Sequence, residues 1–150
     1  MVLLLNETNL NAMCPGNHDY NYSATRLEYL AGKLKADVLS ANTIKRQTGK
    51  RIFKPYKIYK LPSDIKVGVF GLTTPETAYA TNPINVINIE FMNPVESAKL
   101  MVSQLRKKCD VVIGLMHMGL DKNSQFTSDR IAREVDGIDL IIDGHSHTKL

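Results

Sequence analysis

All four histidines of the chain lie in three short stretches, and an apolar run precedes each of them. The stretches are Gly16-Asn17-His18-Asp19, Met116-His117-Met118 and Gly144-His145-Ser146-His147. The apolar runs before them, at 12–15, 111–115 and 138–143, are typical of buried strands. Because side chains that bind ligands converge at the carboxyl ends of strands in an open α/β sheet, we expect these histidines to lie close together.

A metal site is the chemistry that this residue set favours. One histidine after a strand is usually a packed side chain with a satisfied hydrogen bond, and that interpretation stands for each residue alone. Four histidines at three strand ends, one of them next to Asn17, are harder to explain as packing. Imidazole nitrogen together with amide or carboxylate oxygen suits zinc, manganese or iron and does not suit calcium.

The elements that must position these residues alternate between strand and helix patterns. Such alternation predicts an α/β fold with mostly parallel strands joined by helical crossovers. Asn93-Pro94-Val95-Glu96 has the form of a helix start, with a side-chain cap and a proline in the first turn. We expect strands at 12–15, 37–41, 65–72, 84–91, 111–115 and 138–143, and helices at 27–34, 93–108 and 124–135.

Composition indicates the class of protein and excludes some others. The 150 residues are 43% hydrophobic and 23% charged, which is the profile of one globular α/β domain. No apolar run approaches the roughly 20 residues needed to cross a bilayer. The apolar start at 1–5 lacks the basic flank of a signal peptide, and we interpret it as the tail of a helix. Two cysteines, Cys14 and Cys109, cannot build a disulfide framework and leave the compartment open.

The charge pattern favours a small anionic substrate over nucleic acid. The formal charge of +4 is compatible with an anionic substrate, and it is too modest to predict a nucleic-acid polymer as partner. Seven basic residues lie between 45 and 60, interleaved with aromatic and aliphatic residues. They form either a nucleic-acid surface or a hairpin whose charged side chains face water and protect a sheet edge; we favour the hairpin.

The histidine stretches, in this order and spacing, resemble the motifs of the calcineurin-like metallophosphoesterases. Ser40-Ala41-Asn42, Gly71-Leu72-Thr73-Thr74-Pro75 and the run that ends in Thr148 look most like the 5'-nucleotidase branch and its cyclic-nucleotide phosphodiesterase relatives. The resemblance covers nearly the whole chain. It implies an α/β fold that is part of a four-layer α-β-β-α sandwich, without its first strands, and a bimetal centre on loops at one end.

The resemblance also implies a role for each residue of the site. Asn17, His117 and His145 would bind one metal and His147 the other, while His18 would be the catalytic imidazole. The cofactors would be two divalent ions of manganese, zinc, iron or cobalt, and the substrate a nucleotide or another phosphoester. Two cations about 3.5–4 Å apart clamp the phosphate and lower the pKa of a bridging water.

Two departures from the family pattern limit what we expect of the chain alone. Asn21 stands where the nucleotidase branch usually has an aspartate, and an amide cannot stabilise an imidazolium as a carboxylate does. No acidic ligands of the family's first strands precede Gly16. We therefore expect residues 1–150 to be the central and C-terminal part of a catalytic domain, without the N-terminal metal-binding strands and the C-terminal nucleotide-binding domain.

Three hypotheses about function follow. The first is a dinuclear-metal-dependent phosphohydrolase of the 5'-nucleotidase type, active in nucleotide catabolism, of which this chain is an inactive piece by itself. The second is an inactive remnant or a binding module of the same fold, and the third is a phosphodiesterase on cyclic nucleotides. By the resemblance, the parent protein would be extracellular, periplasmic or associated with the cell wall.

Overall fold

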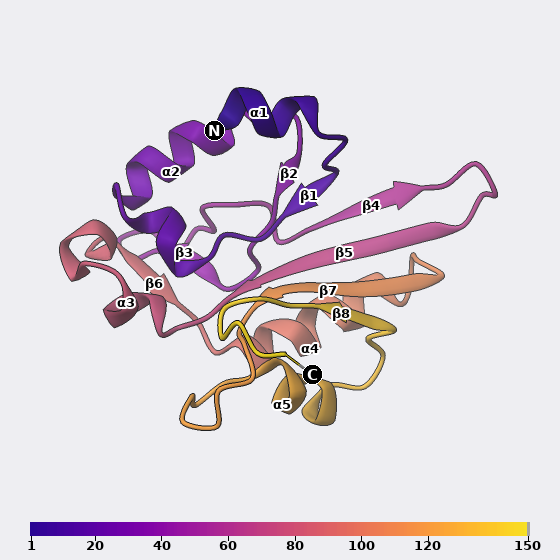
Figure 1. Ribbon diagram of the computed structural model, residues 1–150. Helices are drawn as coiled ribbons and strands as arrows, with labels where there is room; N and C mark the ends of the chain where they lie inside the picture. The colour runs from indigo at the N-terminus through magenta and orange to yellow at the C-terminus, as the bar shows by residue number, and fades with distance from the viewer. Residues whose placement is uncertain (150) are drawn as a thin grey trace.

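A four-stranded sheet forms the centre of the molecule. The computed structural model describes residues 1–149 (Figure 1). The strands lie in the order β4-β5-β7-β8; β4 is antiparallel to β5, whereas β5, β7 and β8 are parallel. Their bounds are β4 Tyr56–Lys60, β5 Lys66–Thr73, β7 Val111–His117 and β8 Leu140–Ile142.

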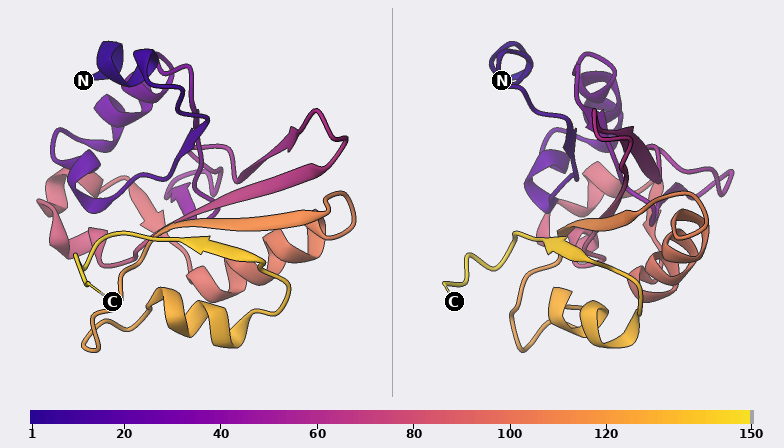
Figure 2. Two further views of the ribbon diagram at one scale, coloured as in Figure 1. Left: turned by 45° about the vertical axis from the view of Figure 1, so that its right-hand side comes forward. Right: turned by 90° about the vertical axis from the view of Figure 1, so that its right-hand side faces the viewer.

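Two smaller sheets and the helices complete the fold. A parallel pair joins β1 (Ala12–Met13) to β2 (Asp37–Val38), and an antiparallel pair joins β3 (Thr43–Lys45) to β6 (Ile89–Phe91). In Figures 1 and 2, α4 and α5 lie on one side of the central sheet, and α1 and α2 lie on the other. The helices are α1 Val2–Glu7, α2 Ala24–Ala31, α3 Thr77–Ala80, α4 Pro94–Leu105 and α5 Ser128–Glu134, with 3-10 turns η1 Asn17–Tyr20 and η2 Pro83–Val86.

Helix α4 builds the main core against the central sheet. It begins as its sequence predicts, because the Asn93 side chain accepts hydrogen bonds from the Val95 and Glu96 amides at 2.9 and 3.3 Å. Its apolar face packs on the inward side chains of β5 and β7; the fully buried members include Ala98, Met101, Leu105, Phe70, Leu72 and Val112. This packing fixes a register in which Thr73 pairs with His117. The last residues of β5 and β7 therefore lie side by side.

A second core holds the Asn17 loop in place. Tyr20 of η1 is fully buried, and its ring meets the Phe91 ring edge-on at a centroid distance of 5.6 Å. Around it pack further buried residues of α2, β2, η2 and β6, namely Leu27, Val38, Val86 and Ile89, together with Phe53. The loop that carries Asn17 and His18 is thus held by residues distant in the sequence.

The α/β class and the mostly parallel central sheet are confirmed, with helices on both sides as in part of a layered sandwich. The helix predicted at 27–34 begins earlier, at Ala24, because the Ser23 hydroxyl caps it by accepting from the Arg26 amide. The predicted strands at 12–15, 37–41 and 138–143 are present but shorter. The apolar start is part of a helix, as expected.

Three local predictions were confirmed only in part. The strand predicted at 84–91 is a strand only from Ile89, because Pro83 and the Asn82 side chain, which accepts from the Ile84 amide, start a 3-10 turn. The helix predicted at 124–135 starts at Ser128, after a turn in which the Asp121 carboxylate accepts from the Asn123 amide. The basic stretch 45–60 is not one hairpin. Its last residues form edge strand β4, which pairs with β5 and leaves its lysines exposed.

Across residues 1–149, none of the helices has both the length and the apolar character required to span a bilayer.

Candidate metal centre

Three of the predicted ligands converge at one end of the sheet. The Asn17 Oδ1 atom lies 3.0 Å from His117 Nε2 and 3.2 Å from His145 Nδ1, and these two nitrogens are 3.2 Å apart. The two imidazole rings are tilted by 58°, with centroids 4.9 Å apart. Asn17 is buried, and both histidines are partly buried. We call this set of three atoms the ligand triangle.

The loops after β7 and β8 are bound to each other, and this places His117 and His145. The Asp143 carboxylate accepts hydrogen bonds from the Met118 and Gly119 amides at 2.8 and 2.9 Å. The Ser146 hydroxyl accepts from the Leu120 amide at 2.9 Å. His145 itself has a left-handed backbone, with φ of 101°. A residue other than glycine rarely adopts this conformation, and such residues concentrate at functional sites.

The Asn17 loop approaches the His117 ring closely because residue 16 is a glycine. A Cβ atom at Gly16 would lie 2.6–2.8 Å from three atoms of the His117 ring, closer than any real contact. The Asp19 carboxylate accepts a hydrogen bond from the Gly16 amide at 2.8 Å and so fixes the turn. Asn17 can therefore reach His117 only if position 16 carries no side chain.

A buried polar network connects this loop to β5. The Asn42 side chain donates to the Thr73 carbonyl at 2.8 Å and accepts from the Thr73 amide at 3.0 Å. The Thr73 hydroxyl donates to the Pro15 carbonyl at 3.0 Å. Asn42 and Thr73 are both fully buried. Two of the segments that carried the family resemblance, at 40–42 and 71–75, thus form the support of the site.

The ligand triangle fits a single divalent cation of the first transition row. Such a cation has bonds of about 2.1 Å to nitrogen and oxygen, so ligands at right angles lie about 3.0 Å apart. The three distances of the triangle match this spacing. Burial, and next the neighbouring His145, lower the pKa of His117 from its ordinary 6.5, so its nitrogen is free to bind a cation at neutral pH. Within residues 1–149, no three His, Cys, Asp or Glu side chains are grouped so that they could hold a metal ion by themselves; the third candidate ligand here is an amide.

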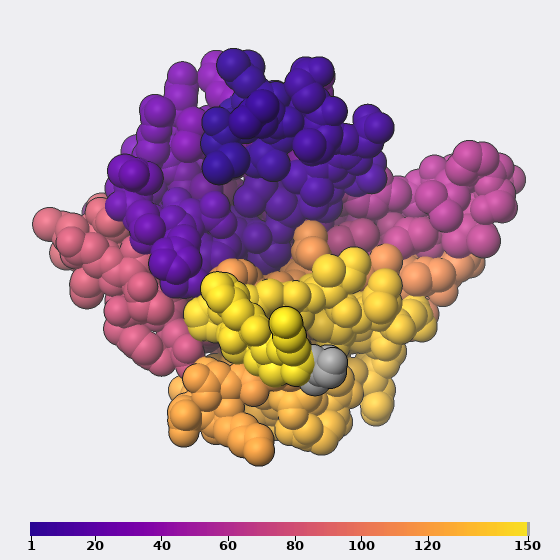
Figure 3. Space-filling model, in the orientation of Figure 1, coloured from indigo at the N-terminus to yellow at the C-terminus, as the bar shows by residue number. Residues whose placement is uncertain are grey.

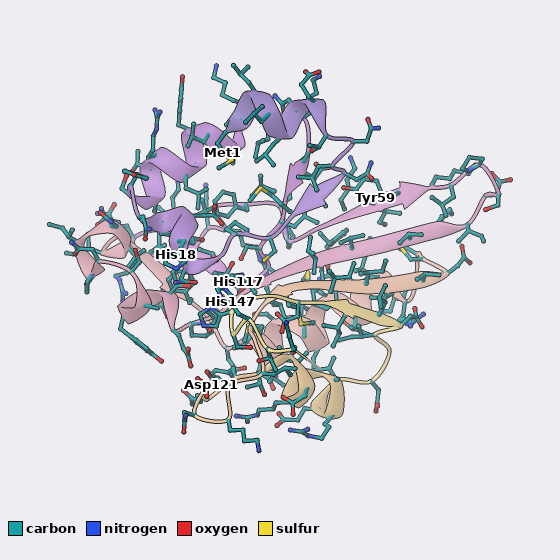
Figure 4. All side chains as sticks on the ribbon, in the orientation of Figure 1. Met1, His18, Tyr59, His117, Asp121 and His147 are labelled. Atoms are coloured by element: carbon teal, nitrogen blue, oxygen red, sulfur yellow. The ribbon has the colours of Figure 1, made fainter. Side chains whose placement is uncertain are left out.

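The other two predicted residues lie outside the triangle. His18 is exposed, and its Nδ1 atom is 3.3 Å from the Asn21 Nδ2 atom. His147 is exposed with φ of 52°, and it lines a cavity of about 630 Å³ that His145 and Asp143 also line. In the view of Figure 4, His18, His117 and His147 gather toward the same end of the sheet.

Sequence reasoning missed three residues of the site. Gly16 and Asp143 act through the close approach and the loop contacts described above. Glu76, which follows β5, has its Oε2 atom 3.5 Å from His145 Nε2. Glu76 could have been found as a carboxylate three residues after central strand β5, and Asp143 as a carboxylate directly before Gly144.

Comparison with known proteins agrees with this geometry. The sequence matches the family described as calcineurin-like phosphoesterase over residues 2–149. It is 35% identical over 151 residues to Protein UshA of Escherichia coli, covering 95% of this chain and 27% of the relative. It is also 35% identical over 145 residues to a 5'-nucleotidase of Vibrio cholerae, covering 91% of this chain and 26% of the relative. The chain thus spans about a quarter of the length of these relatives.

A solved structure supports the same assignment. The calcineurin-like phosphoesterase YfkN from Bacillus subtilis superimposes with a TM-score of 0.86 at 26% sequence identity. The match covers 98% of this chain and 48% of that one. Because the family match extends over nearly every residue, the chain belongs to the calcineurin-like phosphoesterase family.

Proposed function

We propose that this chain supplies part of the active site of a metal-dependent phosphohydrolase that acts on nucleotides. The observation that carries the proposal is the ligand triangle, in which Asn17, His117 and His145 bring one oxygen and two nitrogens within 3.0–3.2 Å of each other. The substrate class comes from the relatives, several of which are named 5'-nucleotidases.

The triangle would hold one divalent cation of manganese, zinc, iron or cobalt, and His147 would hold the second. When bound, the two cations supply Lewis acidity toward the phosphoryl oxygens and lower the pKa of bound water. Asn17 contributes a neutral oxygen, so it binds without adding negative charge that would repel a phosphate. The fixed loops of Asp143 and Ser146 keep the two imidazoles in place, so little reorganisation accompanies the reaction.

His18 would move a proton at the leaving oxygen of the phosphoester. It follows Asn17 directly and is exposed, so a substrate at the triangle has access to its ring. The Asn21 amide nitrogen faces Nδ1, and the Asn21 oxygen accepts a hydrogen bond from the Thr81 hydroxyl at 3.1 Å. With an N–H group directed at Nδ1, the proton of the neutral ring belongs on Nε2. That nitrogen is then the donor toward the leaving group.

The proposal extends to the domain to which these residues belong and to its location. Residues 1–150 would form the central and C-terminal part of a catalytic domain whose remaining ligands come from other strands. We propose a location outside the cytoplasm, since a relative is a snake venom 5'-nucleotidase. Asn21 is the observation that favours the second candidate, an inactive remnant or binding module, because it removes the carboxylate that supports the catalytic imidazole.

A chimera tests the proposed function directly. The 150 residues would replace the matching segment of the Vibrio cholerae 5'-nucleotidase, and hydrolysis of AMP and of 2',3'-cyclic AMP would be measured with added manganese. We expect AMP hydrolysis that His117→Ala and His18→Ala each abolish. A folded chimera without AMP hydrolysis would favour the remnant, and a preference for the cyclic nucleotide would favour a phosphodiesterase.

The isolated chain provides the second arm of the test. With one ligand triangle and without the acidic strands of the family, we expect no hydrolysis of p-nitrophenyl phosphate or AMP above buffer in the presence of manganese or zinc. Turnover by the isolated chain that His117→Ala removes would show that residues 1–150 are sufficient.

A further inference from the structure

Glu76 contacts His145 at the ring nitrogen that does not face the ligand triangle. Its Oε2 atom lies 3.5 Å from His145 Nε2, while His145 Nδ1 faces Asn17 and His117. Both side chains of the pair are largely shielded, at 16% exposure for His145 and 18% for Glu76. Such shielding reduces the competition from water that weakens exposed pairs.

The backbone holds Glu76 at this position. The Thr74 amide donates to the His117 carbonyl at 3.0 Å, so the segment after β5 is attached to the end of β7. The Glu76 amide donates to the Thr74 hydroxyl at 3.3 Å, and the Ala80 amide donates to the Glu76 carbonyl at 2.7 Å. Glu76 therefore keeps a fixed place relative to His117, and its carboxylate approaches His145 from the side opposite the triangle.

The chemistry of the pair determines which nitrogen of His145 carries the proton. A neutral imidazole has one N–H, and an ionised carboxylate only accepts hydrogen bonds. With Glu76 beside Nε2, the proton belongs on Nε2, and the Nδ1 lone pair points at the triangle. If the proton were on Nδ1, that nitrogen could donate to Asn17 Oδ1 but could bind no cation. The lone pair of Nε2 would then face the lone pairs of the Glu76 carboxylate.

We propose that Glu76 is a positioning residue, whose carboxylate accepts from His145 Nε2–H and thereby directs the Nδ1 lone pair into the ligand triangle. The importance of this role rests on the proposed metal-dependent function. Carboxylates that hold a metal-binding histidine in this way fix both ring orientation and tautomer, and their loss typically weakens metal binding about 10–100-fold.

The tautomer is measured first, on the metal-free protein. Long-range proton–nitrogen NMR correlations at about pH 8, where ordinary histidine is neutral, report which ring nitrogen carries hydrogen. We expect His145 of the unsubstituted chain to carry it on Nε2, and Glu76→Ala to populate the Nδ1–H form. A proton on Nδ1 in the unsubstituted chain overturns the inference without any variant.

Metal affinity is measured second, with cobalt(II) titrated calorimetrically and by its visible absorption. Glu76→Ala should bind cobalt about 10–100-fold more weakly. Glu76→Gln keeps an acceptor oxygen and loses the charge, so its affinity should fall between the two and its tautomer should stay Nε2–H. Glu90→Ala is the matched control, because Glu90 is an exposed carboxylate on β6 that pairs with Arg46.

The outcomes separate the inference from the proposed function. If the unsubstituted chain binds cobalt and Glu76→Ala binds it equally well, the inference fails and the metal proposal stands. If the unsubstituted chain binds no cobalt, the claim that the triangle alone holds a cation fails, and the tautomer of His145 decides whether Glu76 places the proton. If Glu90→Ala weakens cobalt binding as much as Glu76→Ala does, the change in net charge explains both results, and the inference is overturned.

Discussion

Gly16→Ala tests whether the close approach of the Asn17 loop to His117 sets the affinity of the metal centre. The added methyl group would lie 2.6 Å from the nearest His117 ring atom, which is about 0.8 Å closer than the 3.4 Å at which ordinary contact begins. Either the ring or the loop must move by nearly that amount. Metal ligands need to be held within about 0.5 Å of their productive positions, so the triangle cannot stay intact.

The expected loss of affinity follows from that displacement. Misplacing one ligand by loss of its support typically weakens metal binding about 10–100-fold, or roughly 1.4–2.8 kcal/mol. Overpacking also destabilises a fold, typically by about 1–3 kcal/mol. We therefore expect cobalt affinity to fall by at least about tenfold, with a cooperative but lower thermal transition.

Isothermal titration with cobalt and thermal unfolding with and without the metal are the assays. Gly32→Ala is the matched control, because its φ is −67° and an added Cβ would meet only ordinary contacts, the nearest at 3.5 Å. It should leave both affinity and the thermal shift unchanged. A Gly16→Ala protein that binds cobalt as tightly as the Gly32→Ala protein would refute the reasoning.

Three further predictions concern the support of the site, the proposed catalytic imidazole of His18 and the thiol of Cys14. Asn42→Ala leaves the buried backbone groups of Thr73 without partners, so urea unfolding should show a loss of about 3–5 kcal/mol; a loss below about 1 kcal/mol would contradict the network. In the chimera, Asn21→Asp should raise kcat for AMP about tenfold or more at unchanged KM, because a carboxylate stabilises the protonated His18; an unchanged kcat would count against that role. Desolvation raises the pKa of Cys14 from 9.0 to about 12, so the folded chain should lose stability as pH rises from about 9 toward 12. Cys14→Ala should remove this decrease in the free energy of unfolding between about pH 9 and 12. An unaltered pH dependence of stability in the variant would show that the thiol is not its source.

The sequence was sufficient to predict that Asn17, His117 and His145 meet. His117 and His145 end or follow neighbouring parallel strands of one sheet, so fold class alone brings them to one edge. Asn17 also follows a strand pattern, but its strand β1 belongs to a separate sheet, and loop packing completes its approach. Helix α4 was predictable for a local reason, since Asn93 and Pro94 specify its start. In both cases a short-range pattern carries the structural information.

Long-range contacts were beyond the sequence patterns. The Glu76–His145 contact joins residues 69 apart, and the position of Glu76 after a strand does not identify its partner. The close approach of Gly16 to the His117 ring depends on how two loops pack, which periodicity does not encode. At 84–91 the alternation of apolar residues suggested a strand, but Asn82 and Pro83 started a 3-10 turn instead. Figure 3 shows the C-terminal segment (yellow) on the face toward the viewer, and its Ser146 hydroxyl accepts a hydrogen bond from the Leu120 amide, 26 residues earlier.

Anomalous diffraction from crystals soaked in manganese or cobalt tests the central claim most directly. We predict an anomalous peak within about 2.0–2.4 Å of Asn17 Oδ1, His117 Nε2 and His145 Nδ1. Crystals in which the metal occupies other sites, with no anomalous density at the triangle, would contradict the assignment of these three side chains as ligands.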